Sequence, residues 1–360
     1  MIILAVESSC DETAVALVRD GRTVLADCIA SSVEMHRIYG GVVPEIASRK
    51  HIEVIAQLAD QALEQAGLSR GDIDAVAVTY APGLIGAVLV EVSFAKSVAY
   101  ALGVPLIPVH HVRGHIAANY LAHPDLEPPF VCLCVSGGTS LLVDVKGYTE
   151  MEILGATRDD AAGECFDKIA RVMGLGYPGG APLDRAAQGG NDKAFSLPRV
   201  HIQDAPLDMS FSGLKTAMLN LIHNAQQKGE ELPVADLAAS FSAAVSEELV
   251  PRTMAAAQAK GYGKVAVVGG VAANSRIRRD LEQACQAAGC TLYLPPLKLC
   301  GDNGSMIGSQ GYYEYLAGTR AGTDLNAYAN REISRPYGTG TAPVFPSPVE
   351  KSVESVHNSL

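Results

Sequence analysis

Residues 130–154 read FVCLCVSGGTSLLVDVKGYTEMEIL, and this stretch decides the fold. The apolar run FVCLCV predicts a buried strand, SGGT a tight polar turn, and SLLVDV a second strand. The dipeptide KG then turns the chain into a third strand-like run, YTEMEIL. A strand, a polar turn, a strand, a glycine turn and a third strand therefore follow one another in a single block.

The same order opens the chain. Ile2–Val6 predicts a buried strand, and the polar residues 7–13 follow it as a turn. Ala14–Arg19 predicts a second strand, which Asp20-Gly21 joins to a third over Thr23–Ala30, since Asp-Gly is a strong hairpin signal. Because the pattern appears once in each half, the sequence predicts a duplicated domain and not a short-period repeat.

Helices and strands alternate after each opening block. Glu45–Ala66 carries apolar residues at near-helical spacing and is followed by Gly67, a typical helix end. Ser275–Ala288 predicts a helix that follows the short strand Val265–Val268. Such alternation predicts two α/β lobes with parallel strand pairing and a cleft between them, where ligands gather beyond the carboxyl ends of the strands.

The composition narrows the class of protein. With 360 residues and 48% hydrophobic content, the chain can bury a large core in two lobes. We expect no signal peptide and no membrane span, because the first residues lack a basic region and we find no apolar stretch of spanning length. The eight cysteines include no Cys-x-x-Cys pair, which suits free thiols in the cytosol. The net charge of −11 argues against broad, nonspecific nucleic-acid binding.

A histidine cluster follows the strand-like run that ends at Val109. It reads His110-His111-Val112-Arg113-Gly114-His115 and leads into an apolar helix. On a helix, His111 and His115 stand one turn apart on one face and can chelate a cation, whereas His110 points elsewhere. The alternative is a pair of histidines hydrogen-bonded to nearby backbone at a helix start. A zinc-protease site is excluded, because no Glu follows the first histidine as general base.

Two glycine turns follow strands in the second half. Ser136-Gly137-Gly138-Thr139 either binds an anion through its backbone N–H groups or is an ordinary hairpin turn. Gly269-Gly270 is a second turn of this kind, and the two loops together are expected to grip a nucleotide from both ends. By contrast, residues 174–179 (GLGYPG) follow a helical pattern and contain a proline, so they are no dinucleotide-binding motif, and residues 212–216 (SGLKT) lack the first glycine of a P-loop.

Three carboxylates have two readings each. Asp302 either caps the last helix or completes a set of two histidines and one carboxylate with open positions for substrate. Asp11 and Glu12 follow the first strand, and they are either turn residues facing solvent or acids facing the cleft.

Six motifs, taken together and in this order, resemble one family, the universal tRNA threonylcarbamoyltransferases in their bacterial branch (the TsaD family), once described as sialoglycoprotein endopeptidases. The resemblance covers about residues 2–337. The motifs are Val6-Glu7-Ser8-Ser9-Cys10-Asp11-Glu12-Thr13, His110-His111-x-x-x-His115, Val135-Ser136-Gly137-Gly138-Thr139, Tyr177-Pro178-Gly179-Gly180, Phe211-Ser212-Gly213-Leu214-Lys215-Thr216 and Gly269-Gly270-Val271-Ala272-Ala273-Asn274.

The resemblance implies a fold and a reaction. The fold would be α/β, with two duplicated lobes like those of actin, Hsp70 and the sugar kinases (ribonuclease H-like) and a cleft between them. The reaction would move a threonylcarbamoyl group from threonylcarbamoyl-AMP to N6 of adenine 37 in tRNAs that read codons starting with adenine, forming t6A and releasing AMP. Helpers would be a paralogous subunit, TsaB, and a small ATPase, TsaE, with no membrane involved. The compartment would be the cytoplasm.

The resemblance also implies site residues. One divalent metal, Fe²⁺ ahead of Zn²⁺, would be held by His111, His115 and Asp302, and Asp11 or Glu12 would accept the amine proton. Archaeal and eukaryotic relatives carry a tyrosine where this chain has Cys134, so no fourth protein ligand is carried over. The residues implied to line the adenylate are Cys134, Val135, Ser136, Gly137, Gly138, Asp167, Gly180, Asp184 and Asn274.

We expect an N-terminal lobe over residues 1–128, with the metal-binding helix, and a C-terminal lobe over residues 129–341, with the nucleotide-binding loops. The last helix, at about 303–317, is expected to pack back toward the N-terminal lobe. The Pro- and Ser-rich residues 342–360 are expected to be disordered.

Two rival functions remain at this stage. A sugar-kinase-like ATP-dependent phosphotransferase would share the duplicated strands, but it would offer an Asp-Gly-Thr-type loop where this chain has Glu7-Ser8-Ser9, and it gives the histidines no task. A non-enzymatic, nucleotide-gated scaffold for partner proteins is the other.

Overall fold

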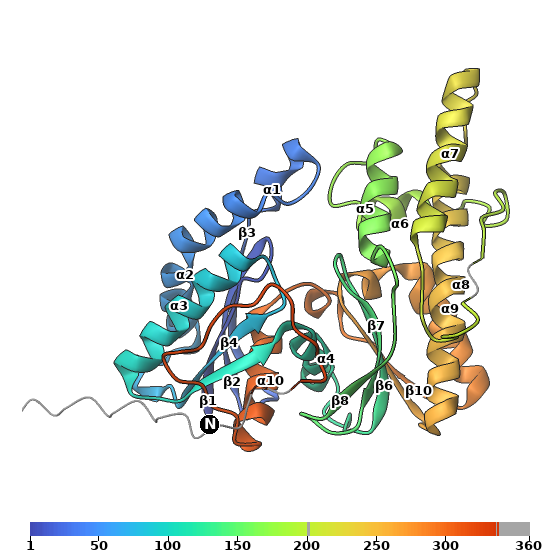
Figure 1. The fold of residues 1–360 in the computed structure, drawn as a ribbon. Coiled ribbons are helices and arrows are strands. Elements are labelled where there is room, and N and C mark those ends of the chain that lie inside the picture. Colours follow the sequence, from blue (N-terminus) through green and yellow to red (C-terminus); the bar gives the residue numbers. More distant parts are fainter. Residues whose placement is uncertain (200–201, 336, 338–360) are drawn as a thin grey trace, which may run out of the picture.

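The structure is a computed structural model that describes residues 1–199, 202–335 and 337 (Figure 1). Residues 342–360, for which we predicted disorder, lie outside the described part. Two α/β lobes stand side by side, and helices α4 and α10 lie between them (Figure 1).

Each lobe is built on a five-stranded mixed sheet, and the two sheets have the same topology. The first has the order β3-β2-β1-β4-β5, and the second, read in the same direction, β8-β7-β6-β9-β10. In both sheets the first three strands of the lobe pair antiparallel. The fourth strand pairs parallel with the first, and the fifth pairs parallel with the fourth. The predicted duplication and the α/β class are confirmed. The strands are β1 Ile2–Glu7, β2 Glu12–Arg19, β3 Thr23–Ser31, β4 Ala75–Ala81, β5 Leu106–His110, β6 Phe130–Val135, β7 Ser140–Val145, β8 Met151–Ala156, β9 Lys264–Val268 and β10 Thr291–Tyr293.

The helices cover the faces of both sheets. In the first lobe, α2 and α3 pack against each other and against the sheet, and in the second, α8 packs with α6, α7 and α9. The α-helices are α1 Val33–His36, α2 Pro44–Ala66, α3 Ile85–Leu102, α4 His111–Ala122, α5 Ala162–Val172, α6 Gly180–Ala186, α7 Ser212–Lys228, α8 Val234–Lys260, α9 Ser275–Ala288 and α10 Gly304–Leu316. The short 3-10 helices are Arg37–Tyr39, Arg70–Asp72, Gly270–Ala273 and Leu297–Leu299.

Most predicted elements lie within two residues of the observed ones. The hairpin turn at Asp20-Gly21 has positive φ angles of 50° and 67°, as a type I′ turn requires. The third strand of the second lobe begins later than predicted, at Met151 instead of Tyr148, because the loop after Lys146 closes on Glu150 through backbone hydrogen bonds.

We expected no apolar stretch of membrane-spanning length, and helix α3 shows that this expectation was wrong. This helix spans 18 residues with a mean hydropathy of 1.6, so by length and composition alone it is long enough to cross a membrane. In the structure one face of it packs against β4 and α2, and 33% of its residues are buried. It also carries the fully buried Glu91.

Helix α10 comes late in the chain yet packs on the first sheet. It does so through small residues: a Cβ atom at Gly304 would lie 2.7 Å from the Ala16 backbone nitrogen, and one at Gly308 would lie 2.5 Å from the Val18 side chain. The helix also contacts α4 along its length. Glycines thus let the helix lie directly on the strands, and the loop before it arrives beside the start of α4.

The far end of α4 is held by Arg22, from the β2–β3 turn. Its guanidinium donates to the backbone carbonyls of Tyr120 (3.0 Å) and Leu126 (3.0 Å) and to the hydroxyl of Tyr313 (2.7 Å). It also donates to the Tyr148 hydroxyl of the second lobe (3.2 Å). A single side chain therefore ties the end of α4 to both lobes.

Candidate active site

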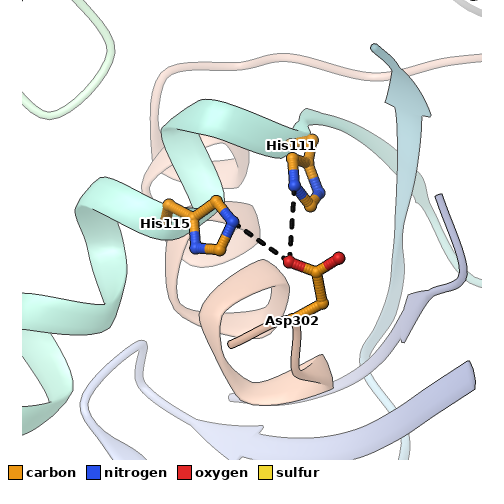
Figure 2. Close-up of side chains that lie close together, drawn as sticks. All are labelled: His111, His115 and Asp302. Carbon is orange, nitrogen blue, oxygen red and sulfur yellow. Dashed lines mark ion pairs between the residues drawn. The ribbon is translucent and has the colours of Figure 1, made fainter. Parts of the chain in front are cut away.

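Helix α4 starts at His111, so both predicted chelating histidines lie in its first two turns. His111 and His115 present their rings on one face, with ring centroids 4.6 Å apart (Figure 2). His110 is the residue before the helix, and its Nε2 bonds the backbone carbonyl of Arg331 at 3.0 Å. The prediction that His110 points away from the pair is confirmed.

Asp302 lies in the loop before α10 and points at both histidines (Figure 2). Its Oδ1 is 3.1 Å from Nε2 of His115 and 3.6 Å from Nε2 of His111. The alternative reading as a helix cap is wrong, because Asn303 is the N-cap of α10 and accepts the Met306 N–H at 2.8 Å. The carboxylate of Asp302 is therefore left for the histidines.

A carboxylate from β3 fixes this loop from behind. Asp27 accepts hydrogen bonds from the backbone N–H groups of Gly304 (3.3 Å) and Ser305 (3.2 Å) at the start of α10. Burial raises the pKa of Asp27. The hydrogen bonds from Ser305 and Gly304 lower this pKa but only partly offset the effect of burial. A residue of the first lobe thereby sets where Asp302 stands.

The ligand atoms of His111, His115 and Asp302 all lie within 4.8 Å of one another, so this group can hold a metal ion. Two further observations fit a cation there. Nδ1 of His115 is buried without a hydrogen-bond partner among the described residues, and its Nε2 faces the Asp302 carboxylate as an ion pair without hydrogen-bond geometry. Two imidazoles and a carboxylate are also common ligands of Fe²⁺ and Zn²⁺.

His111 is oriented from its other side by Glu7. Its Nδ1 lies 3.0 Å from Oε2 of Glu7 and 3.1 Å from the Ser9 hydroxyl, so Nε2 is the atom directed at Asp302. Glu7 ends β1, is fully buried and accepts the Ser9 N–H at 2.7 Å. A carboxylate behind a metal-binding histidine is a recurrent arrangement. Sequence reasoning quoted Glu7 within a motif but gave it no role.

The charges around the cluster favour a cation. Burial lowers the pKa of His111, but the carboxylates of Glu7 and Asp302 outweigh it and raise that pKa to about 9. Burial raises the pKa of Asp302, but His111 and His115 bring it down to about 2. Two buried carboxylates thus face the two imidazoles, and a positive charge is stabilised between them, carried by a proton or by a metal.

The cluster lies at the side of a large pocket between the lobes, with a volume of about 1300 Å³. Its first-lobe wall includes Asp11, Glu12, His111 and Asp302, so the cleft reading of the two acids is confirmed. Burial and the neighbouring Asp11 raise the pKa of Glu12 to about 9, so the Glu12 carboxyl is mostly protonated at neutral pH.

The second-lobe wall is formed by the two glycine turns. Ser136–Thr139 and Gly270 line the pocket, and a Cβ atom at Gly137, Gly138 or Gly270 would meet nothing within 4 Å. Gly269 does need to be glycine, because its φ is +92° and a Cβ atom would lie 2.3 Å from the Val135 carbonyl. The turns therefore touch, and they form one continuous wall instead of two opposed ends as predicted.

Of the other residues implied for the adenylate, only Asp167 is among the residues that line the pocket. Asp167 lines the pocket and accepts the Gly179 N–H at 2.7 Å, and Gly180 begins α6. Asp184 and Asn274 meet at the start of α9: Asp184 accepts from the N–H (3.1 Å) and hydroxyl (2.8 Å) of Ser275, while Asn274 accepts the Ile277 N–H at 3.1 Å.

Cys134 and Val135 are the innermost of the implied residues. Both are buried in β6, and the Cys134 sulfur contacts the Cys132 sulfur at 3.8 Å. Cys134 is outside the group of described ligand atoms that can hold a metal.

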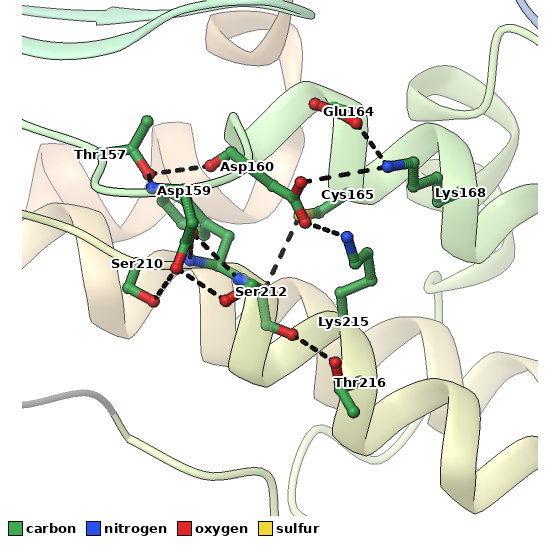
Figure 3. A network of polar contacts seen from close by, with 11 residues as sticks. Thr157, Asp159, Asp160, Glu164, Cys165, Lys168, Ser210, Ser212, Lys215 and Thr216 are labelled. Atoms are coloured by element: carbon green, nitrogen blue, oxygen red, sulfur yellow. Dashed lines mark hydrogen bonds and ion pairs between the residues drawn. The ribbon is translucent and has the colours of Figure 1, made fainter.

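The SGLKT motif starts α7 and belongs to a polar network beside the pocket (Figure 3). The Asp159 carboxylate accepts from the N–H groups of Phe211 (2.8 Å) and Ser212 (3.1 Å), and Lys215 pairs with Asp160. Because nearby Thr157 lines the pocket and bonds the Asp160 carbonyl at 2.8 Å, the network fixes a pocket wall. Residues 212–216 therefore form the first turn of a helix.

One part of the pocket was missed altogether. The segment 328–335, which runs from β4 to α4, forms a third wall. Its sequence, YANREISR, has no periodicity and follows the last helix, so no sequence signal placed it near the histidines.

Known proteins resemble this chain over most of its length. The sequence profile of the family described as TsaD, tRNA N6-adenosine threonylcarbamoyltransferase, matches residues 23–309. Proteins of that name from Clostridium botulinum (strain 657 / Type Ba4) and Moorella thermoacetica (strain ATCC 39073 / JCM 9320) are 52% and 55% identical. The first match covers 92% of this chain and 97% of that protein, and the second 90% and 95%.

Among solved structures, HypF of T. kodakarensis resembles the chain with a TM-score of 0.60 at 17% identity. The match covers 90% of this chain and 49% of that one, so it shows the fold alone. The similarity in sequence reaches further, since it extends over nearly the whole length of both proteins at about half identity. The chain belongs to the family of tRNA N6-adenosine threonylcarbamoyltransferases, acyltransferases that form t6A in tRNA.

Proposed function

We propose that the pocket between the lobes takes threonylcarbamoyl-AMP and passes its threonylcarbamoyl group to N6 of adenine 37 in tRNAs that read codons starting with adenine. The observation that carries this proposal is that the His111–His115–Asp302 group and the open glycine turns line or border one pocket of about 1300 Å³. An acyl adenylate has a carbonyl group that must be activated for attack. It also has a phosphate whose negative charge must be stabilised.

The metal end is formed by α4 and the loop before α10. We assign His111, His115 and Asp302 as ligands of one divalent ion, Fe²⁺ ahead of Zn²⁺, since two histidines and one carboxylate leave positions open as in non-haem iron sites. When bound, the ion supplies a Lewis acid that polarises the carbamoyl carbonyl. Glu7 keeps the His111 ring in place, and Asp27 keeps the Asp302 loop in place.

The adenylate end is formed by the second lobe. Backbone N–H groups of Ser136–Thr139 are proposed to meet the phosphate, because the open space at Gly137 and Gly138 lets an anion approach the chain. Asp167, Gly180, Asp184 and Asn274 are proposed to surround ribose and adenine. Both Asp184 bonds to Ser275 use Oδ1, which leaves Oδ2 for a ribose hydroxyl. Cys134 and Val135 support the Ser136 turn from within β6.

The attacking amine of adenine 37 must lose a proton. Asp11 and Glu12 both line the pocket, and we assign Asp11 as the acceptor, because Glu12 with a pKa raised to about 9 keeps its own proton. Glu12 then donates a hydrogen bond and limits the negative charge beside Asp302.

Helper proteins are part of the proposal. Exposed apolar side chains occur before and along α2 and in the first turns of α3, two helices that touch where Ser48 meets Gly86, and we take these side chains as one patch. It includes Ile38, Ile52, Ile85 and Leu89, which are 82%, 65%, 53% and 49% exposed. Such a patch marks a protein interface, and we propose that the paralogous subunit TsaB covers it in the cytoplasm while the ATPase TsaE joins the complex. Partners would also supply basic surface for tRNA that this acidic chain lacks.

The test incubates the purified chain, with and without the two helpers, with threonylcarbamoyl-AMP and an unmodified tRNA that reads an ANN codon. Mass spectrometry of the tRNA should show t6A at position 37 and liquid chromatography should show AMP. Phosphorylation of a sugar by ATP would favour the kinase, and an unmodified tRNA in every mixture would favour the scaffold. His115→Ala is the matched inactive variant.

A further inference from the structure

The segment Tyr328–Arg335 is fixed on the elements that carry the metal-binding histidines. The Tyr328 N–H donates to the Tyr80 carbonyl at 2.9 Å. The Arg331 carbonyl accepts from His110 at 3.0 Å, and Arg113 of α4 donates to the Ile333 carbonyl at 2.7 Å. The side chains of the segment are therefore placed relative to His111 by the shared helix α4.

Arg331 is unlike the other cations of this pocket. Among the pocket-lining residues that the structure describes, Arg335 pairs with Glu332 at 3.4 Å, whereas the Arg331 side chain has neither a carboxylate nor a hydrogen-bond partner. Its Nε atom is buried. The pocket around it is lined by the carboxylates of Asp11 and Asp302, among others, yet none of them reaches the guanidinium.

Tyrosine rings hold the guanidinium in place. Its central carbon lies 5.2 Å from the Tyr328 ring centroid, 5.4 Å from that of Tyr80 and 5.9 Å from that of Tyr337. Contacts of this kind place the cation over the ring faces and use none of its N–H groups in a hydrogen bond. They leave its N–H edge free to donate in the plane, where a carboxylate or phosphate accepts two parallel hydrogen bonds. The Arg331 guanidinium is thus a placed donor without an acceptor among the described residues.

We propose that Arg331 binds the free carboxylate of the threonyl group and so selects a donor that carries an amino acid on its carbamoyl nitrogen. This inference rests on the proposed function. Arg331 bonds through its backbone to the residue next to His111, so it stands on the metal side of the pocket, where the acyl group lies. The phosphate is assigned to the glycine turns of the other lobe. A phosphodiester of tRNA is the other source of an anion, and the test separates the two.

The experiment measures three affinities by calorimetry, for threonylcarbamoyl-AMP, for AMP and for unmodified tRNA, with wild type, Arg331→Gln and Arg331→Lys. Arg331→Gln should weaken the binding of threonylcarbamoyl-AMP about ten- to a hundredfold, because a hydrogen-bonded charge pair is lost. The affinities for AMP and for tRNA should change less than about threefold, which is the size of effect expected from a weak, solvent-exposed charge contact. Arg331→Lys, which keeps the charge without the fork, should fall between. The matched control is Arg320→Gln, because Arg320 also stacks on a tyrosine, 3.6 Å from the Tyr315 ring, but does not line the pocket.

Each other outcome has one meaning. Equal weakening of AMP and threonylcarbamoyl-AMP would place Arg331 at the phosphate, and weakening of tRNA alone would place it on the phosphodiester; both overturn the inference. So does Arg331→Gln with wild-type affinities. Unchanged metal content and melting temperature guard against misfolding. If wild type binds threonylcarbamoyl-AMP no tighter than AMP and leaves tRNA unmodified, the proposed function itself has failed.

Discussion

Glu7 and His111 meet across the first lobe, with Oε2 of the buried glutamate 3.0 Å from Nδ1 of the histidine. Glu7 ends β1, and His111 starts α4 directly after β5, so strand β4 lies between their two strands in the sheet. The bond decides which ring nitrogen of His111 faces Asp302. It therefore converts a generic pair of histidines into a preset chelating face.

Glu7→Gln should lower the metal affinity of the protein about ten- to a hundredfold, because the ring loses the acceptor that orients it. Titration of the apo-protein with Fe²⁺ or Zn²⁺ measures this. Glu91→Gln is the matched control: burial raises the pKa of Glu91 well above its usual value, so the amide copies its neutral form. Equal losses in both variants would mean that packing, and not orientation, is responsible.

His111→Ala combined with His115→Ala should remove the bound metal. The ligand atoms of these two histidines and Asp302 lie within 4.8 Å of one another, and no single one of them holds an ion alone. Elemental analysis should find about one metal per wild-type chain and per His110→Ala chain, since His110 bonds Arg331 instead. Stoichiometric metal in the double variant would refute the site.

Asp184→Ala tests the adenylate end. Loss of the two bonds to Ser275 at the start of α9 should cost about 1 kcal/mol of stability. Loss of a ribose contact should also weaken threonylcarbamoyl-AMP about ten- to a hundredfold. Melting temperature and calorimetric affinity are measured on the same variant. A lower melting temperature with unchanged affinity would show that Asp184 serves α9 alone.

The pH dependence of stability reports on Glu12. Its pKa is about 9 in the folded protein against 4.5 as the ordinary value, because burial and Asp11 disfavour the charge. The folded state therefore binds the extra proton between these values, and metal-free protein should lose stability as the pH rises from 4.5 through 9. Glu12→Gln should flatten that decline in urea titrations from pH 5 to 10. Parallel curves for both proteins would rule out a neutral Glu12.

Ile52→Glu tests the partner surface. The side chain is 65% exposed on α2, so the charge should leave the fold intact and abolish co-purification with the paralogous subunit. Ile55, one turn further, is only 4% exposed, and its replacement would disrupt the core instead. Leu316→Glu, at an exposed apolar position of α10, is the control and should still co-purify. Retention of the partner by Ile52→Glu would move the interface elsewhere.

Features that depend on residues near each other in the chain could be predicted from the sequence. Contacts between segments far apart in the chain could not. The hairpin at Asp20-Gly21 and the helical spacing of His111 and His115 depend on neighbours in the chain, so both were predicted correctly. Helix periodicity placed Ile52 and Ile55 on one apolar stripe, although the sheet covers only the second. The roles of Glu7 and Arg331 depend on packing between remote segments, and no local pattern encodes such contacts.

The third side chain of the histidine–carboxylate group comes from a late part of the chain. The glycines of α10 dock Asp302 onto strands that left the ribosome long before, while His111 and His115 emerge with the first lobe. At about 5–20 residues per second, residues 116–301 take roughly ten to forty seconds to synthesise. During that interval the two histidines have no third ligand. An ion held by all three side chains therefore binds only after residue 302 has been synthesised, and a chain cut short before that residue lacks the third ligand.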